Sequence, residues 1–291
     1  MSDYFYHLLI LFCLYSVTAQ GLNIVFGLGG QFNLAHIAFF SVGAYCTALL
    51  STDLGWHFSS CLLTSILLPG LFALVVGEIS LRLDKDYFAM ATLSFAAIIN
   101  SLEINWKSLT NGVLGVSGIA RPELLNLDFS DNLNFLLLSS VFFILAQITA
   151  YLVFSSRFAR SLQMLAIDSA SAEALGRDAR LLRNIAFFIS ACFAGAGGSL
   201  FAYYLNYIDP SSFMLPEMVL ILTICIVAKP GSFWGIFPAT FVLVILIPEG
   251  LRFVEMPSSV LGPLRQMCHA LILFFVVLIF RHSLFPKRRE V

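Results

Sequence analysis

The chain has 291 residues, of which 59% are hydrophobic and only 11% are charged, and its mean hydropathy is +0.90. Soluble domains contain about 45–50% apolar and about 25% charged residues, so this composition excludes an ordinary soluble protein. The formal net charge of −1 and the absence of a basic stripe in the sequence give no indication of nucleic-acid binding. The composition therefore predicts a single all-α domain, residues 1–291, embedded in a membrane.

The sequence also lacks the patterns of metal, nucleotide and covalent chemistry. Its six cysteines are scattered without a CxxC pair, which a structural metal or redox site would need. The patterns GxxxxGK[ST], HExxH and GxSxG do not occur. We therefore expect a protein that is not an enzyme and that holds no metal or cofactor of its own.

Apolar stretches near the roughly 17–25 residues that cross a bilayer follow one another along the chain. They cover residues 6–26, 33–50, 60–81, 87–105, 133–154, 183–204, 215–228, 233–251 and 266–280. The second stretch follows a glycine-rich break at 27–30 and the seventh is short. The pattern predicts a polytopic bundle of about eight or nine spanning helices, interrupted by polar segments at 107–132 and 157–182.

The distribution of lysine and arginine predicts an orientation, because cytoplasmic loops are enriched in these residues. If segment 157–182 is cytoplasmic and the spans alternate, most of the 16 basic residues lie inside. The exceptions are Lys107, Arg121, Arg252 and Arg265. This arrangement predicts a periplasmic N-terminus, a cytoplasmic C-terminus and an external loop at 107–132.

The segment 157–182 has a second feature, a short helix predicted between two membrane helices. Ser169 or Ser171 is a suitable N-cap, and Glu173 would then lie near the first turn, where the helix dipole favours a carboxylate. Gly176 is suited to end the helix. Such a helix can transmit movement from a cytoplasmic motor, and it can equally be an ordinary structural loop.

Polar side chains inside apolar stretches are costly and are candidates for a transport path. Asn23, Gln31, Asn33 and His36 flank the break at 27–30, where free backbone groups can bind an amino acid. These side chains can equally satisfy the break itself, and His36 is better explained as a hydrogen-bonded interior histidine. Two further candidates for the path, or for helix packing, lie in the fourth stretch: Thr92 and Ser94.

Other patterns concern helix packing and helix ends. A stripe of small residues in the sixth stretch allows close approach of a helix from this chain or from another subunit; it consists of Ser190, Ala194, Gly198 and Ala202. Four acidic residues fall near helix ends, where pairing or contact with the membrane interface is expected: Glu78, Glu103, Glu217 and Glu249. Glu249 is spaced to pair with Arg252.

Several segments, in order and at similar spacing, resemble the branched-chain amino-acid (LIV-type) ABC transporter permease family, and specifically its M-type subunit. They are 21–40, 86–93, 109–119, 156–162, 172–176 and 284–286. By this resemblance Glu173, Ala174, Gly176 and the following Arg177 belong to the coupling helix that docks on an ATPase. The chain departs from the family at Lys229-Pro230, where relatives tend to carry a glycine pair.

The resemblance implies the permease subunit of an ATP-driven importer that translocates branched-chain or other neutral hydrophobic amino acids across the bacterial inner membrane. It implies a second homologous permease subunit, two cytoplasmic ATPase subunits that bind ATP and Mg²⁺, and a periplasmic binding protein. Three alternatives stay open: a permease of the same family for urea or short amides, a stand-alone secondary transporter, and a membrane enzyme or scaffold without transport activity.

Overall fold

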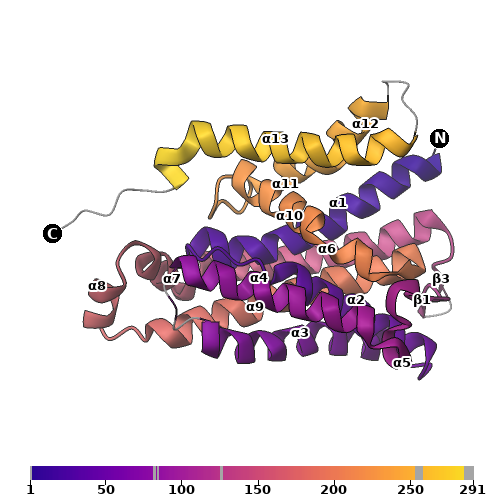
Figure 1. Cartoon of the computed structure of the whole chain (residues 1–291), viewed down its shortest axis with the longest axis horizontal. Coiled ribbons are helices and arrows are strands. Elements are labelled where there is room, and N and C mark those ends of the chain that lie inside the picture. The colour runs from indigo at the N-terminus through magenta and orange to yellow at the C-terminus, as the bar shows by residue number, and fades with distance from the viewer. Residues whose placement is uncertain (1, 81–82, 84, 125–126, 253–257, 285–291) are drawn as a thin grey trace.

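The computed structural model describes residues 2–80, 83, 85–124, 127–252 and 258–284, and its architecture is a bundle of long helices (Figure 1). The α-helices are α1 (Ser2–Leu22), α2 (His36–Thr52), α3 (Phe58–Ser80), α4 (Lys85–Asn105), α5 (Lys107–Thr110), α6 (Asn132–Ser155), α7 (Arg157–Ile167), α8 (Ser169–Ala174), α9 (Ala179–Leu205), α10 (Leu215–Val227), α11 (Ile236–Thr240), α12 (Ile247–Arg252) and α13 (Ser258–Leu284). Two π-helices, η1 (Asn23–Leu28) and η4 (Phe241–Leu246), extend neighbouring α-helices, and two 3₁₀ turns are η2 (Gly112–Leu114) and η3 (Pro210–Phe213). The short strands are β1 (Val116–Ser117), β2 (Glu123–Leu124), β3 (Leu127–Asp128) and β4 (Tyr207–Ile208).

The described residues contain 7 helices that are long and apolar enough to cross a membrane. The shorter α2 corresponds to the second predicted stretch, and the eighth stretch folds as the continuous series α11, η4 and α12. The structure thus confirms an all-α polytopic bundle with about eight or nine spans. The helices form where the sequence is apolar for long enough, because backbone polar groups in lipid must be satisfied within the chain.

Helix α9 is the centre of the bundle and packs against α1, α2 and α3. Its small residues allow this close packing: a Cβ atom on Gly195 would lie 2.1 Å from the Ser65 carbonyl oxygen, and one on Gly198 would lie 2.0 Å from the Phe40 carbonyl oxygen. The predicted stripe of small residues is buried by helices of the same chain. Of the two alternatives for this stripe, packing within the chain is therefore correct.

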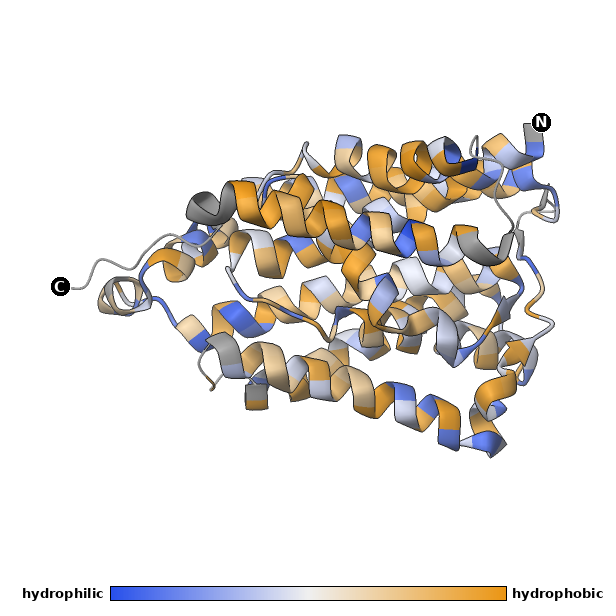
Figure 2. Cartoon of the chain, turned by 45° about the horizontal axis from the view of Figure 1, so that its top comes forward, coloured by the Kyte–Doolittle hydropathy of each residue, from blue (hydrophilic) through white to orange (hydrophobic). Residues whose placement is uncertain are grey.

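Apolar side chains also cover the outside of the bundle. Helices α4, α6 and α13 expose large hydrophobic residues along their length, among them Leu93, Leu152 and Phe274. Figure 2 shows hydrophobic residues along the helices and more hydrophilic ones towards both ends. This distribution is that of a protein whose sides face lipid or another membrane subunit.

The two ends of the bundle differ. Helices α7 and α8 form one end, here called the α8 end, while the start of α1, helix α5 and strand β1 lie at the opposite one, here called the loop end (Figure 1). Basic residues of segment 157–182 belong to elements at the α8 end. Of the four predicted to be external, Lys107 lies in α5, Arg252 in α12 and Arg265 in the first half of α13, while Arg121 lies between β1 and β2. Assignment of the α8 end to the cytoplasm stays a prediction, and the tail 285–291, with Lys287, lies outside the described residues.

The loop end is pinned to the bundle by a strand pair. β1 pairs antiparallel with β4, with Val116 opposite Ile208, so the segment after α5 is fixed to the segment after α9. Gly115 has φ +68°, and a Cβ atom there would lie 2.1 Å from the Ile208 carbonyl oxygen. This position therefore requires glycine both for its backbone conformation and for the close approach.

Candidate functional site

The chain breaks between α1 and α2, as the glycines predict, but later than expected. Gly27 and Leu28 remain helical in η1, and the non-helical segment runs from 29 to 35. Gly30 takes the left-handed conformation with φ +63°, which glycine adopts without strain. The prediction that the break occupies 27–30 is therefore wrong by about two residues at its start, because the π-helix prolongs the first span.

Asn23 lies at the start of η1 and is fully buried. Its Oδ1 accepts a hydrogen bond from the Gly231 N–H at 2.9 Å, and its Nδ2 donates to the Ser232 carbonyl oxygen at 3.0 Å. Both partners belong to the turn between α10 and α11. Asn23 therefore joins two distant parts of the bundle, and in this structure both ends of its amide are occupied.

The segment 29–35 contacts α4 through a hydrogen bond in which the backbone N–H of Leu34 donates to Thr92 Oγ1 at 3.2 Å. Asn33 Oδ1 accepts from the Ala35 N–H at 2.9 Å, so it supports the end of the break. Gln31 Oε1 and Asn33 Nδ2 are buried without a hydrogen-bond partner among the described residues. The structure thus brings three of the predicted path residues together and leaves two polar atoms there for a ligand or for water.

Ser94 does not join this group. It is exposed on α4, and its hydroxyl donates to the Met90 carbonyl oxygen at 2.9 Å. Thr92 and Ser94 are only two residues apart, but that spacing places side chains on different faces of a helix. In the chain as described, Ser94 faces outward.

His36 begins α2 and is fully buried. Its Nε2 lies 2.9 Å from the Thr18 carbonyl oxygen, and its Nδ1 lies 3.2 Å from the Ser190 hydroxyl. These two contacts join α2 to α1 and α9. This geometry matches the expected interior histidine, whose ring nitrogens are both satisfied.

The short helix predicted within segment 157–182 is present as α8, although two details of the prediction are wrong. Asp168 caps the helix, since its Oδ1 accepts from the Ala170 N–H at 3.0 Å, while Ser169 is already the first helical residue. Glu173 consequently lies near the C-terminus of α8 rather than in its first turn. An aspartate outside the helix fulfils the capping role that was expected from a serine.

Gly176 ends the helix as predicted. It has φ +74°, its N–H donates to the Glu173 carbonyl oxygen at 2.9 Å, and the Arg177 N–H donates to the Ala172 carbonyl oxygen at 3.1 Å. These two bonds form a Schellman motif, in which glycine takes the left-handed position. The chain then turns into α9, whose first turn is capped by Asp178 through bonds to the Arg180 and Leu181 N–H groups.

A small apolar cluster fixes α8 to its neighbours. Leu165 of α7, Ala172 of α8 and Ala179 of α9 are buried together. The outward side carries the four predicted coupling residues, Glu173, Ala174, Gly176 and Arg177, all exposed. Two large apolar residues beside them are also exposed, Ile167 at 86% and Leu175 at 70%. The result is a firmly attached projection with an apolar and charged surface at the end of the bundle.

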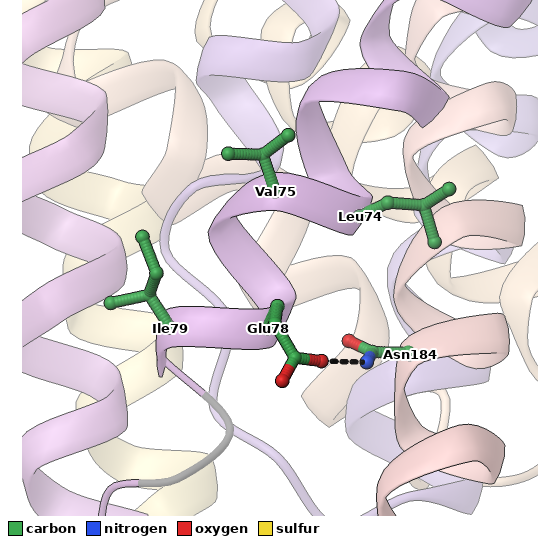
Figure 3. Close-up of a pocket in the computed structure, with 5 residues that line it drawn as sticks. All are labelled: Leu74, Val75, Glu78, Ile79 and Asn184. Atoms are coloured by element: carbon green, nitrogen blue, oxygen red, sulfur yellow. Dashed lines mark hydrogen bonds between the residues drawn. The ribbon is translucent and has the colours of Figure 1, made fainter.

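A shallow hollow lies on the outside of α3 beside α9 (Figure 3). It is lined by Leu74, Val75, Glu78, Ile79 and Asn184, and the Asn184 Nδ2 donates to Glu78 Oε2 at 3.2 Å. The hollow contains none of the predicted site residues. Its open, mostly apolar lining is that of a surface that faces lipid.

Several polar groups are buried in the structure although their burial was not predicted from the sequence. Glu103 was expected at the membrane interface, yet it is only 5% exposed, and neither carboxylate oxygen has a hydrogen-bond partner among the described residues. The Tyr45 hydroxyl and the side-chain amides of Gln20 and Gln147 are likewise buried without a hydrogen-bond partner among the described residues. The expected pair of Glu249 and Arg252 is present at 3.8 Å. The presence of a carboxylate in an apolar stretch was the available signal for Glu103.

Comparison with known proteins agrees with this architecture. Residues 4–280 match the family described as "Branched-chain amino acid transport system / permease component". The chain is 31% identical to the high-affinity branched-chain amino acid transport system permease protein LivM of Escherichia coli K12, over 87% of this chain and 65% of that protein. It is 30% identical to the protein of the same description from Salmonella typhimurium LT2, with the same coverage of 87% and 65%.

The chain thus spans about 65% of the length of the curated relatives that it matches. No solved structure matches the chain significantly. The family match extends over nearly the whole chain and over all of the spanning helices described above. The chain therefore belongs to the branched-chain amino acid transport system permease family.

Proposed function

We propose that the chain is the membrane-spanning permease subunit of an ATP-driven importer for branched-chain or other neutral hydrophobic amino acids in the bacterial inner membrane. Family membership and the description of the two LivM relatives as branched-chain amino acid permease proteins support this substrate class. The observation that carries the mechanism is the exposed surface of α8. Large apolar side chains exposed beside charged ones, at the end of a membrane bundle, are suited to contact a protein partner.

The partner proposed for this surface is one of two cytoplasmic ATPase subunits. Leu175 and Ile167 would bury apolar area against it, while Glu173 and Arg177 would pair with charges around the contact. Because α8 is fixed to α7 and α9 by the Leu165–Ala172–Ala179 cluster, a displacement of α8 would move the central helix α9. Motion of the motor would in this way reach the helices that pack around α9 and switch access between the two sides.

The remaining partners follow from the same proposal. A second, homologous permease subunit would contact the apolar outer surface of the bundle, and a periplasmic binding protein would deliver the substrate to the loop end. The N-terminus and the loop 107–132 would then be periplasmic, and segment 157–182 and the C-terminus cytoplasmic. This chain would hold no cofactor, and ATP and Mg²⁺ would bind to the ATPases.

The test is reconstitution of the chain with its partner subunits in proteoliposomes, with uptake of leucine and of urea compared. Leucine uptake that requires ATP and the ATPases is expected. Uptake of urea alone would favour the amide permease, and leucine uptake driven by an ion gradient without ATPases would favour a secondary transporter.

A pair of variants tests the role of α8. Leu175→Glu places a charge on the proposed contact, and we expect it to abolish co-purification of the ATPase and uptake. Val113→Glu is the matched control, since Val113 is 71% exposed at the loop end. Its ATPase should still co-purify. Retention of the ATPase by Leu175→Glu would contradict the coupling assignment.

A further inference from the structure

Two buried polar groups near the loop end lie on helices that pack against each other. Glu103 is near the end of α4, and Tyr45 is in the second half of α2; both are 5% exposed. Both carboxylate oxygens of Glu103 and the hydroxyl of Tyr45 lack a hydrogen-bond partner among the described residues. Residues of α2 contact residues of α4, so both groups belong to the same pair of packed helices. An unpaired carboxylate of this kind is costly to bury, so its presence calls for a reason.

The surrounding groups do not supply one. The Ser41 hydroxyl lies near Glu103, but it donates to the Ala38 carbonyl oxygen at 2.9 Å. The Thr110 hydroxyl donates at 2.7 Å to the backbone carbonyl oxygen of Glu103 and not to its carboxylate. Among the described residues, no lysine or arginine lies within ion-pair distance of Glu103, whereas Glu249 pairs with Arg252. Another carboxylate, that of the partly buried Glu217, accepts a hydrogen bond from Tyr15.

Buried aromatic rings lie beside Tyr45. The Tyr45 ring lies 6.0 Å from the ring of Phe213, which in turn packs against Phe40 at 5.7 Å and Phe201 at 6.0 Å. A carboxylate, a hydroxyl donor and an aromatic surface are the three elements that a zwitterionic amino acid with an aliphatic side chain requires. The carboxylate would pair with the ammonium group, the hydroxyl would donate to the substrate carboxylate, and the aromatic rings would contact the side chain.

We propose that Glu103 and Tyr45, with the neighbouring Phe213, form a substrate subsite near the loop end that binds the ammonium and carboxylate groups of a hydrophobic amino acid. This inference rests on the proposed transport function and adds the binding groups. In the present structure the subsite is closed. The paired strands β1 and β4 both contact α2, and their displacement would open the subsite to the outside.

The experiment uses the complete transporter with its partner subunits and compares Glu103→Gln, Tyr45→Phe and, as a control, Glu249→Gln. Glu249 is an acidic residue of the same end that already has partners in Tyr4 and Arg252. Glu103→Gln should lower leucine kcat/KM about tenfold or more, because a charge-assisted bond is lost. Tyr45→Phe should act in the same direction, and Glu249→Gln should resemble the wild type.

Thermal unfolding separates binding from a structural role. Without substrate, Glu103→Gln should unfold at the same or a higher temperature than the wild type, because the unpaired buried charge is gone. Leucine should raise the unfolding temperature of the wild type and not that of Glu103→Gln. A lower unfolding temperature with an unchanged leucine response would overturn the inference. If Glu103→Gln does not accumulate, Tyr45→Phe decides, and an unchanged leucine KM overturns the inference.

Two further comparisons identify the ligand and distinguish a failure of the proposed transport function from a failure of the subsite alone. Sodium chloride is compared with choline chloride in the absence of leucine, and a stabilisation by sodium that Glu103→Gln removes would assign the subsite to an inorganic cation instead. If the wild type transports no neutral amino acid, the proposed function fails. If the wild type transports leucine and Glu103→Gln does so equally well, only the subsite fails.

Discussion

Asn23 Oδ1 accepts the Gly231 N–H at 2.9 Å, although the two residues are 208 positions apart. The contact joins the end of the first span to the turn between α10 and α11. This turn contains Lys229, whose φ of +67° is unusual for a residue other than glycine. The two polar bonds of Asn23 hold this unusual turn against η1, which explains why an amide is buried in a membrane span.

Asn23→Ala should destabilise the protein. The substitution removes two hydrogen bonds and leaves the Gly231 N–H unsatisfied, at a cost of about 1–3 kcal/mol. Thermal unfolding of the purified complex in detergent measures this loss, and Ser94→Ala on the exposed face of α4 is the control. A raised leucine KM with unchanged stability would instead make Asn23 a substrate ligand.

Gly27→Ala should be more severe than its size suggests. A Cβ atom there would lie 2.1 Å from Asn23 Oδ1 and 2.2 Å from the Gly231 nitrogen, so the turn must move away. Overpacking of this kind costs about 1–3 kcal/mol. Gly250→Ala is the matched control, because no atom of the residues that the structure describes lies within 4 Å of a Cβ atom built at that helical position. Equal unfolding temperatures for the two variants would contradict the described contact.

His36→Ala should lower stability by about 2 kcal/mol or more, because it removes contacts to α1 and α9 and leaves a buried cavity. Thermal unfolding and the pH dependence of uptake are the measurements. A structural histidine predicts reduced stability and an unchanged pH profile for the remaining uptake. Normal stability combined with an altered pH profile would show that His36 takes part in proton movement.

Gly176 can be tested with two substitutions of similar bulk. Its φ of +74° suits asparagine far better than a β-branched residue, and no neighbouring atom obstructs a side chain. Gly176→Val should distort the end of α8 and abolish uptake while membrane insertion persists, whereas Gly176→Asn should keep much of the uptake. Normal transport by Gly176→Val would remove the coupling role from this turn.

The positions of the spans follow from the sequence because lipid imposes a simple requirement, a long apolar helix. Stretch 133–154, for example, corresponds to α6 within one residue at each end. The role of Gly176 was also predictable, since a glycine that follows a short polar helix commonly ends that helix in the left-handed conformation. Asp168 was missed because Asp168, Ser169 and Ser171 are all favourable N-cap residues, and only the backbone shows which one caps the helix.

Contacts between distant segments were not predictable in the same way. Nothing in the local pattern around Asn23 indicates that its partner is Gly231, because the contact depends on how the spans are arranged. The burial of Glu103 was also not predictable from the local sequence. Its place about two turns beyond the middle of an apolar stretch suggested an interface position, but in the folded chain, where α4 packs against α2, it is buried. The sequence can nominate a polar residue, but burial is decided by its neighbours.

The coupling of α8 to an ATPase is tested most directly by cross-linking in membranes. Leu175→Cys provides an exposed thiol, whereas the native cysteines are buried or partly buried. With a cysteine placed in the groove of the ATPase, position 175 should form a cross-link whose yield changes on addition of ATP, and Val113→Cys should form none. Labelling of position 175 from the periplasmic side, with no cross-link to the ATPase, would contradict the account.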